Sequence, residues 1–415
     1  MLAPGSDGWI SKYFDFVERG ELWVSIRNYE ELSLLKHCHL TFSRCGIIFG
    51  LPTRAIFGHK LNTENWTREE KLKVLLLEAL LFVHLKTGGK LDKESFIQSL
   101  LAFYGDHNVW SLKKVLTFFR KEKDDIKLEK ILEKRVDIKM NLLENKWWVN
   151  SLNNAFVYLD VILYHDFVVN KSTDAISKYS DFAQNSLTAI TLSSYADGEI
   201  SPIERDLFNL FLASANLSDE QREIAHDKFE KGATLDDFDN FIHHHWLLKR
   251  FLMDLSLLTV FSDLHAVETE RSFIEDLRKF MNIPEEEMEE AMMFIENFII
   301  TNRDQSDFLK DAPSYELVYG SFTNRWKKVL SRNKDKLAIE LKESKELVTL
   351  MKKSMSEDLS AEEKKKVKTQ LKDILKSMPA VAIFLIPGGT ILLPMMMKII
   401  PDLLPSAFKD NQIEE

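Results

Sequence analysis

The sequence predicts an all-α protein, and two observations carry that prediction. Apolar residues recur at three- and four-residue spacing through long stretches, the period of an amphipathic helix, whereas alternating β-branched runs are few. Glycine interrupts these stretches rarely, with 14 in 415 residues. We expect five parts in order: an N-terminal helical region over 1–172, a duplicated helical domain over 173–305, a basic helical stalk over 325–376, an apolar membrane segment over 377–408 and a polar tail over 409–415.

The N-terminal region has several helix patterns. Residues 67–87, "TREEKLKVLLLEALLFVHLKT", begin with acids in the first turn and continue with apolar residues at helical spacing. Residues 93–105 and 111–123 predict shorter amphipathic helices. The aromatic stretch 146–169 is expected to form core rather than a ligand pocket.

An internal duplication marks the middle of the chain. "SSYADGEISPIERDLFNLFL" and "TVFSDLHAVETERSFIEDLR" align without a gap, sixty-six residues apart, and each predicts a helix, an acidic turn and a second helix. In the first copy Gly198 permits a positive φ, and Ser201, Pro202 and Glu204 form a helix start. The second copy lacks the glycine.

The acids of the two turns are candidate ligands for a divalent cation, because hard cations prefer oxygen clusters. They would converge if the two copies pack about a pseudo-twofold axis; the alternative is that they cap helices and face solvent. The candidate metal ligands are Asp197, Glu204, Asp263 and Glu270, with Glu199 and Glu268 beside them.

Two other clusters resemble metal sites only superficially. Consecutive histidines at 243–245 point about 100° apart on a helix, so they cannot share one ion from one face. The spacing of His37, Cys38, His39 and Cys45 fits no zinc pattern. We find no phosphate loop, nucleophile elbow or paired acid and base, and we expect no enzyme.

The stalk is basic although the whole chain carries −10. Residues 325–376 hold sixteen Lys/Arg and nine Asp/Glu, and Ser360 with Glu363 forms a capping-box pattern. Residues 332–355 carry mixed charges at i,i+4 spacing and predict one helix. The remaining acidic body is a poor binder of DNA. The lysines could hold anionic lipid or a ribosome, or form a solvated helix face; they are Lys364, Lys365, Lys366 and Lys368.

The apolar segment predicts a membrane helix. Twenty-one uncharged residues separate Lys376 from Lys398, and a helix of that length spans ~31 Å, close to the ~30 Å hydrocarbon core. Pro379 lies in its first turn, while Pro387 with Gly388 and Gly389 predicts a kink. A re-entrant hairpin and a buried core helix are the alternatives. Lysine asymmetry places the N-terminal body on the cytoplasmic side.

This segment resembles the membrane signature of the Letm family, the leucine-zipper/EF-hand transmembrane proteins. The resemblance covers about residues 340–410 and rests on Leu392–Pro394, Pro401, Leu404, Pro405, Ser406 and Phe408. It implies an integral membrane protein linked to exchange of monovalent cations or calcium against protons, and to membrane-bound ribosomes. The chain departs from the family in having no EF-hand loop, and we expect the ribosome-binding domain after the span to be missing. The architecture looks more like that of bacterial Letm-related membrane proteins, some with biofilm-related names, which implies a single-pass protein of the bacterial inner membrane.

The duplicated region resembles the TerB-like tellurite-resistance domain. Its acidic turn is present as Ala196, Asp197, Gly198, Glu199, Ile200, Ser201 and Glu204. The resemblance implies an all-helical module that binds metal through these acids.

Three functions therefore remain open. The first is a membrane-anchored scaffold or sensor that binds a protein partner or an ion. The second is cation/proton exchange by a homo-oligomer, because one span encloses no path and carries no ionisable residue. The third, with less support, is ribosome association through the stalk.

Overall fold

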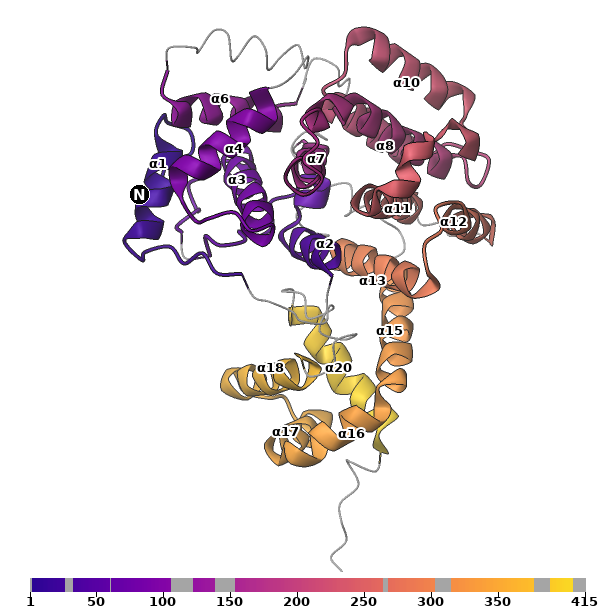
Figure 1. Cartoon of the computed structure of the whole chain (residues 1–415). Coiled ribbons are helices and arrows are strands. Elements are labelled where there is room, and N and C mark those ends of the chain that lie inside the picture. The colour runs from indigo at the N-terminus through magenta and orange to yellow at the C-terminus, as the bar shows by residue number, and fades with distance from the viewer. Residues whose placement is uncertain are drawn as a thin grey trace, which may run out of the picture. The chain divides into compact units, whose positions relative to one another are not determined.

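The computed structural model describes residues 2–26, 33–59, 61–105, 122–138, 154–263, 268–302, 315–376 and 389–405. All regular structure in these ranges is helical, which confirms the all-α prediction (Figure 1). The chain forms two compact units. The N-terminal unit comprises Met1–Ala291 with Gln305–Ala312, and the C-terminal unit comprises Met292–Asp304 with Pro313–Glu415.

The first half of the N-terminal unit is built around one apolar helix, α3. Residues Leu72–His84 of this helix are buried all round, and its neighbours are α7, α6 and α2. A helix that is apolar on every side is stable only inside a protein core or a membrane. The elements are α1 (Trp9–Glu18), α2 (Leu34–Cys45), η1 (Ile47–Phe49), α3 (Arg68–Lys86), α4 (Lys93–Gly105), α6 (Asp124–Val136) and α7 (Val157–Val169).

A buried ion pair joins α6 to α7. Arg135 Nε donates to Asp160 Oδ2 at 2.7 Å, and both side chains are almost fully enclosed. Tyr104 donates its hydroxyl to the same carboxylate at 2.9 Å, and the Arg135 guanidinium lies over the Tyr179 ring at 4.3 Å. Burial alone lowers the pKa of Arg135, but the Asp160 carboxylate outweighs burial and raises that pKa.

The second half of this unit contains the two segments that the sequence aligns. Each is a helix, a short connection and a helix: α8 with α9, and α11 with α12; α8 packs against α11. The elements are η4 (Ala175–Lys178), α8 (Tyr179–Ser194), α9 (Pro202–Ser214), α10 (Asp219–Lys231), η5 (Leu235–Asp237), η6 (Asn240–His244), α11 (Trp246–Asp263), α12 (Glu268–Phe280) and α13 (Glu285–Asn302), the last contributing to both units.

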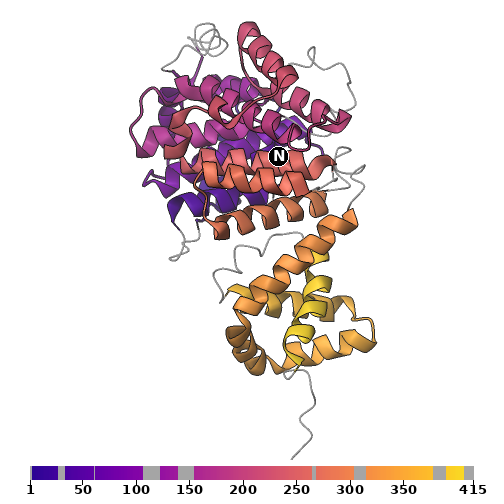
Figure 2. The same cartoon turned by 90° about the vertical axis from the view of Figure 1, so that its right-hand side faces the viewer.

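The C-terminal unit is a small helical bundle rather than an extended stalk (Figure 2). The sequence predicted one helix over residues 332–355, but the chain changes helix at Ser344, which lets leucines on both sides reach a common core. The helices are α15 (Tyr315–Arg332), α16 (Lys334–Glu343), α17 (Lys345–Ser356), α18 (Ala361–Lys376) and α20 (Gly389–Leu403).

Helix starts read from the sequence are confirmed where the structure describes them. Ser201 and Glu204 form a reciprocal capping box at α9, and Gly198 has φ +93°. Ser360 and Glu363 do the same at α18, with amide contacts of 2.8 and 3.2 Å. The predicted helix over 111–123 lies almost entirely outside the described residues.

The predicted kinked membrane helix is not shown. Residues 377–388, with Pro379, Pro387 and Gly388, lie outside the described part of the chain, as does the tail 409–415. Helix α20 begins at Gly389 and runs through Pro394, Lys398 and Pro401, ending two residues before Pro405. None of the helices in the described ranges combines the length and the apolarity that a membrane crossing needs.

Candidate functional site: acidic turn, polar network and basic bundle

The acidic turn before α9 is shaped by its own hydrogen bonds. Asp197 is exposed and accepts the amide of Glu199 at 3.1 Å. Glu204 is buried and accepts the amide of Ser201 at 2.9 Å, which orients its carboxylate toward the helix start. These contacts match the alternative of helix capping that the sequence left open.

The second half of the predicted metal site cannot be compared with the first. The side chains of Asp263 and Glu270 lie outside the described part of the structure. Within the described residues, no group of three or more His, Cys, Asp or Glu side chains could hold a metal ion. Cation binding by these four acids therefore stays a prediction.

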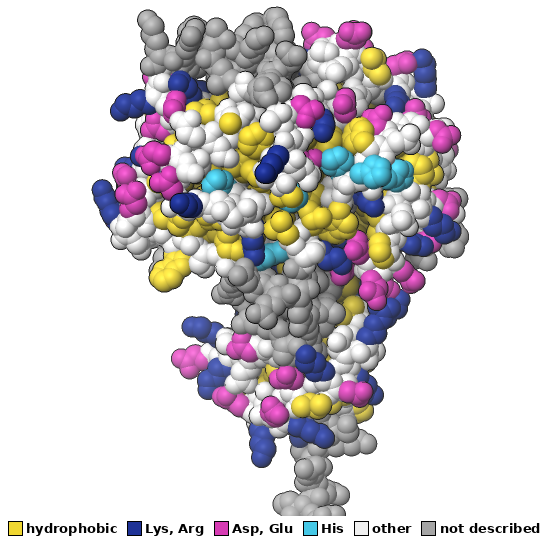
Figure 3. Space-filling view, in the orientation of Figure 1, with side chains coloured by type: hydrophobic (Ala, Val, Ile, Leu, Met, Phe, Trp, Pro, Cys, Tyr) yellow, Lys and Arg dark blue, Asp and Glu magenta, His cyan; other side chains and the backbone are white. Residues whose placement is uncertain are grey.

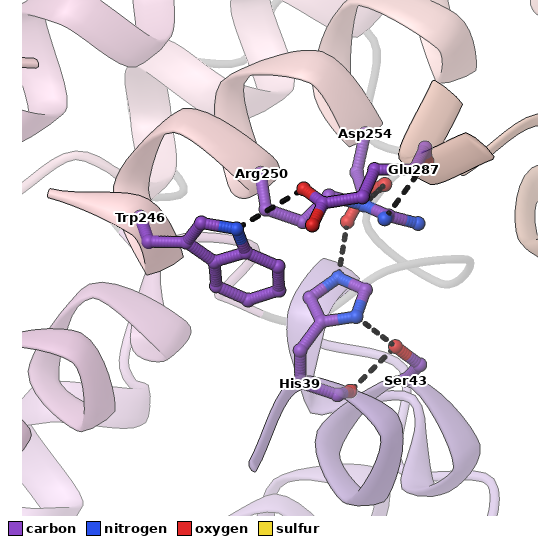
Figure 4. A network of polar contacts seen from close by, with 6 residues as sticks. All are labelled: His39, Ser43, Trp246, Arg250, Asp254 and Glu287. Atoms are coloured by element: carbon purple, nitrogen blue, oxygen red, sulfur yellow. Dashed lines mark hydrogen bonds and ion pairs between the residues drawn. The ribbon is translucent and has the colours of Figure 1, made fainter. Parts of the chain in front are cut away.

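A polar network that the sequence did not indicate joins α2, α11 and α13 of the N-terminal unit (Figure 4). At its centre, His39 Nε2 lies 2.7 Å from Asp254 Oδ2, and Arg250 Nε donates to Asp254 Oδ1 at 3.1 Å. All three side chains are buried. Burial lowers the pKa of His39 and Arg250 lowers it further, while Asp254 opposes both.

The edge of the network lies on the first turn of α13. Glu287 accepts the Trp246 indole N–H at 3.1 Å and pairs with Lys36 at 3.0 Å, and its carbonyl accepts from Arg250. Ser43 donates its hydroxyl to the His39 carbonyl at 2.6 Å, and its Oγ lies 3.4 Å from His39 Nδ1.

Asp254, His39 and Ser43 resemble a nucleophile triad by residue type only. The Ser43 proton is directed to a backbone oxygen of its own helix, and the imidazole is fixed by a buried carboxylate. A serine nucleophile must instead hand its proton to the imidazole. The arrangement holds three helices together, and no local motif predicts it, because its central partners His39 and Asp254 are 215 residues apart.

The histidines at 243–245 do not form one site. His243 and His244 lie in η6, and His245 Nδ1 lies 3.1 Å from Asp166 Oδ2. The structure thus places His245 in a pair with one carboxylate.

The basic surface of the C-terminal unit centres on α18. Val367, Leu371 and Leu375 are buried on its inner side. Lys366 pairs with Glu346 of α17 at 2.9 Å, which fixes one of the four predicted contact lysines to the bundle.

The other three predicted lysines are available. Lys364, Lys365 and Lys368 are exposed and form no ion pair with a described residue. In the space-filling view, Lys and Arg side chains are interspersed with Asp and Glu over the visible face of this unit (Figure 3). Lys364, Lys365 and Lys368 therefore form an exposed basic patch on α18.

Helix α20 fills the core of the same bundle. Its buried side chains include Met395, Met396, Ile399 and Ile400, and Leu404 just after its end is buried too, whereas Lys398 and Asp402 are exposed. Its main neighbour is α15, whose buried stripe is Phe322, Trp326 and Leu330. From Met395 to Pro405, where the structure describes side chains, the predicted membrane segment is therefore amphipathic and packed on protein.

A buried carboxylate links the end of α13 to α15. Glu296 Oε1 accepts from Ser321 Oγ at 2.6 Å and from Arg325 Nε at 3.0 Å. Burial raises the pKa of Glu296, and the contacts with Arg325 and Ser321 only partly oppose this.

Comparison with known proteins bears on the C-terminal part of the chain. Residues 359–415, which include α18 and α20, match a family model described as "LETM1-like, RBD". We expected no part of a ribosome-binding domain here, yet the matched model carries the RBD description. Comparison with curated proteins and with solved structures gave no match. The TerB-like resemblance stays a prediction. Over residues 359–415 the chain is therefore similar to the Letm family.

Proposed function

We propose that this protein is a Letm-type scaffold that attaches to an anionic membrane surface through the lysine face of α18. The C-terminal bundle is the attachment module, and the helical N-terminal unit is the part that binds other proteins. The single observation that carries the proposal is the exposed trio Lys364, Lys365 and Lys368 within the segment that matches the family model.

The expected strength of this attachment follows from charge. A basic residue near an anionic bilayer contributes about 1 kcal/mol, so three contribute about 3 kcal/mol, or a factor of about 150 in affinity. The whole chain carries −10, so attachment requires that positive charge be concentrated locally. The excess of basic over acidic residues in 325–376 supplies that concentration.

The proposal also fixes the orientation and the kind of activity. The basic segment precedes the apolar one, so the positive-inside rule favours a cytoplasmic N-terminal unit, as at a bacterial inner membrane. We propose action through binding surfaces rather than through an active site, because the buried polar network of Figure 4 holds helices together. A divalent cation at the acidic turns would be a regulator of this unit.

Vesicle flotation tests the proposal. The full chain is mixed with neutral phosphatidylcholine vesicles or with vesicles containing phosphatidylglycerol, and the K364E/K365E/K368E variant is compared with the native chain. We expect the native chain to float with anionic vesicles and the variant to lose about two orders of magnitude or more in affinity. The loss should shrink at high salt, where the Debye length falls to about 3 Å.

A matched control variant separates the effect of the α18 lysines from the effect of the net charge of the chain. The K12E/K90E/K134E variant reverses three exposed lysines of the N-terminal unit and changes net charge by the same amount. It should lose much less affinity than the α18 variant. Equal losses in the two variants, or no flotation of the native chain, would refute the proposal.

Ribosome association is a second candidate, which the RBD description of the matched model favours. The same lysine face would contact ribosomal RNA phosphates. Co-sedimentation with ribosomes, using the two triple variants, measures it. Cation/proton exchange stays an alternative, and dye-loaded liposomes containing the purified chain test it: a proton flux driven by a cation gradient would support exchange.

A further inference from the structure

We infer that Glu296 forms a protonation-controlled latch between the second half of α13 and α15. The contact is closed while the carboxyl group carries a proton, and it loosens when the proton leaves. Both partners belong to the C-terminal unit, which contains Met292–Asp304 and Pro313–Glu415. The inference does not depend on the proposed membrane attachment.

Glu296 is the only charged residue between Met292 and Asn302 of α13, and its surroundings on that helix are apolar. Its neighbours one turn away are Met292, Met293, Ile299 and Ile300, and the last three are buried. The side chain of Glu296 itself is 0% exposed. A charged carboxylate is costly in such a place unless hydrogen bonds and an opposite charge compensate it.

Helix α15 compensates only part of this carboxylate. Its Oε1 atom accepts from Ser321 Oγ at 2.6 Å and from Arg325 Nε at 3.0 Å. The Oε2 atom is buried and has no hydrogen-bond partner in the described part of the chain. The charged form therefore leaves one buried oxygen unpaired, whereas protonation removes the buried charge.

The opposite charge that faces Glu296 is also weak. Among the described residues, Arg325 is the one charged group that acts on this carboxylate. The Arg325 side chain is 27% exposed, so water screens its attraction. The remaining described contact from α15 is the neutral hydroxyl of Ser321.

The direction of the response follows from these contacts. Burial raises the pKa of Glu296, and Arg325 and Ser321 lower it only in part. The closed contact thus binds the proton more tightly than an open one, in which water reaches the carboxyl group. By linkage, the closed contact is favoured in acid and is lost as pH rises through the closed-state pKa.

Opening of the latch would be a local event. Helices α17 and α18 are joined by Lys366–Glu346 at 2.9 Å and by Lys353–Glu363 at 2.8 Å, and neither pair involves α13 or α15. Helix α18 is therefore an internal reference for the response of α15.

Hydrogen–deuterium exchange on the full chain tests the latch. Protection factors are compared, because they remove the intrinsic pH dependence of amide exchange. We expect the protection of α15 to fall about tenfold or more from acidic to mildly alkaline pH, since an unpaired buried charge is costly. The protection of α18 should not follow. Protection of α15 that does not change with pH, or that falls equally in α18, would overturn the inference.

Two variants and a matched control assign the response to Glu296. Glu296→Gln keeps the shape of the side chain and cannot ionise, so α15 should stay protected throughout. Arg325→Gln removes the opposite charge and should make the fall in protection larger than in the native chain. Lys327→Gln removes an exposed charge of α15 two residues away and should leave the native response unchanged. A native-sized fall in Glu296→Gln, or equal responses in the Arg325 and Lys327 variants, would overturn the inference.

Infrared difference spectroscopy detects the proton itself. The spectrum of the native chain minus that of Glu296→Gln should contain the C=O stretch of a protonated carboxyl group at mildly acidic pH, where an exposed glutamate is ionised. We expect this band to disappear as pH rises, together with the protection of α15. Absence of the band at a pH where α15 is fully protected would overturn the inference, because the closed contact would then hold a carboxylate.

Discussion

The Arg135–Asp160 pair makes the sharpest test of the N-terminal unit. Its side chains are 2% and 0% exposed, and Asp160 also accepts the Tyr104 hydroxyl. Asp160→Asn preserves the shape but leaves the Arg135 guanidinium as a buried charge without a counter-ion. Breaking a buried pair in this way costs about 3–5 kcal/mol, a large part of the ~5–15 kcal/mol stability of a typical domain.

A double variant distinguishes the cost of leaving one buried charge unpaired from the cost of removing both charges. In R135M/D160L both charges are replaced by apolar side chains, which is often neutral or stabilising. Tyr104 then loses its acceptor, which costs about 1–3 kcal/mol. We therefore expect the double variant to be more stable than Asp160→Asn alone. Adding Tyr104→Phe to the double variant should recover most of the stability lost through the unpaired hydroxyl.

Urea unfolding, followed by far-UV circular dichroism, and hydrogen–deuterium exchange at α7 measure these differences in the free energy of unfolding. The control is Asp227→Asn, which breaks an exposed ion pair with Lys231; the Lys231 and Asp227 side chains are 72% and 59% exposed. This variant should cost less than about 1 kcal/mol. If Asp160→Asn costs no more than this control, the pair is not enclosed as described and the reasoning fails.

Three further predictions concern other sites. The raised pKa of Glu296 means that its contribution to stability is present at low pH and is lost as pH rises through the folded-state pKa. The stability of Glu296→Gln should therefore rise relative to that of the native chain from acid to neutral pH, as measured by hydrogen–deuterium exchange at α15. A stability difference that does not change with pH would contradict this. His39→Ala should destabilise the protein by about 3 kcal/mol, because it removes a donor from the buried Asp254 carboxylate. Ser43→Ala is the control and should cost about 1 kcal/mol in the same unfolding measurements. Equal costs for the two variants would refute the network. Gly50→Ala should cost more than Gly88→Ala: both have positive φ, but a Cβ at Gly50 would lie 2.3 Å from the Asn154 carbonyl oxygen and one at Gly88 would meet nothing within 4 Å. The extra cost is about 1–3 kcal/mol by thermal unfolding, and equal losses would show that the loop can move.

Local features of the fold could be predicted because they depend on neighbours in the sequence. The starts of α9 and α18 need only a serine and a glutamate three residues apart, and the structure has both capping boxes. The helical character of 67–86 follows from spacing alone. Such features are decided within one or two turns, so tertiary contacts have little scope to change them.

The arrangement of the stalk was harder to predict. Mixed charges at helical spacing predicted a single helix across Ser344, since intrinsic helix propensity there is unbroken. The structure shows two helices, because a break at Ser344 lets Leu341 and Leu347 both be buried. Burial of an apolar helix face contributes more stability than the interruption of the helix at Ser344 costs. Only the structure of the bundle shows which face of each helix is buried.

The candidate sites divide in the same way. The lysines of α18 could be found from the sequence, since an exposed basic face is a local property of one helix. The ion pair that removes Lys366 from this face depends on α17. The His39–Asp254 contact joins residues 215 positions apart, and no spacing rule relates them.

The apolar C-terminal segment shows most clearly what each level determines. The sequence by itself determined that residues 377–408 are apolar and must be covered by lipid or by protein, because exposed apolar surface is unfavourable in water. The tertiary structure decided that α15 covers the described part of it, with Met396 and Ile400 buried and Lys398 in solvent. The hydrophobic effect fixes how much surface is buried but has no direction, so only the three-dimensional arrangement determines the partner.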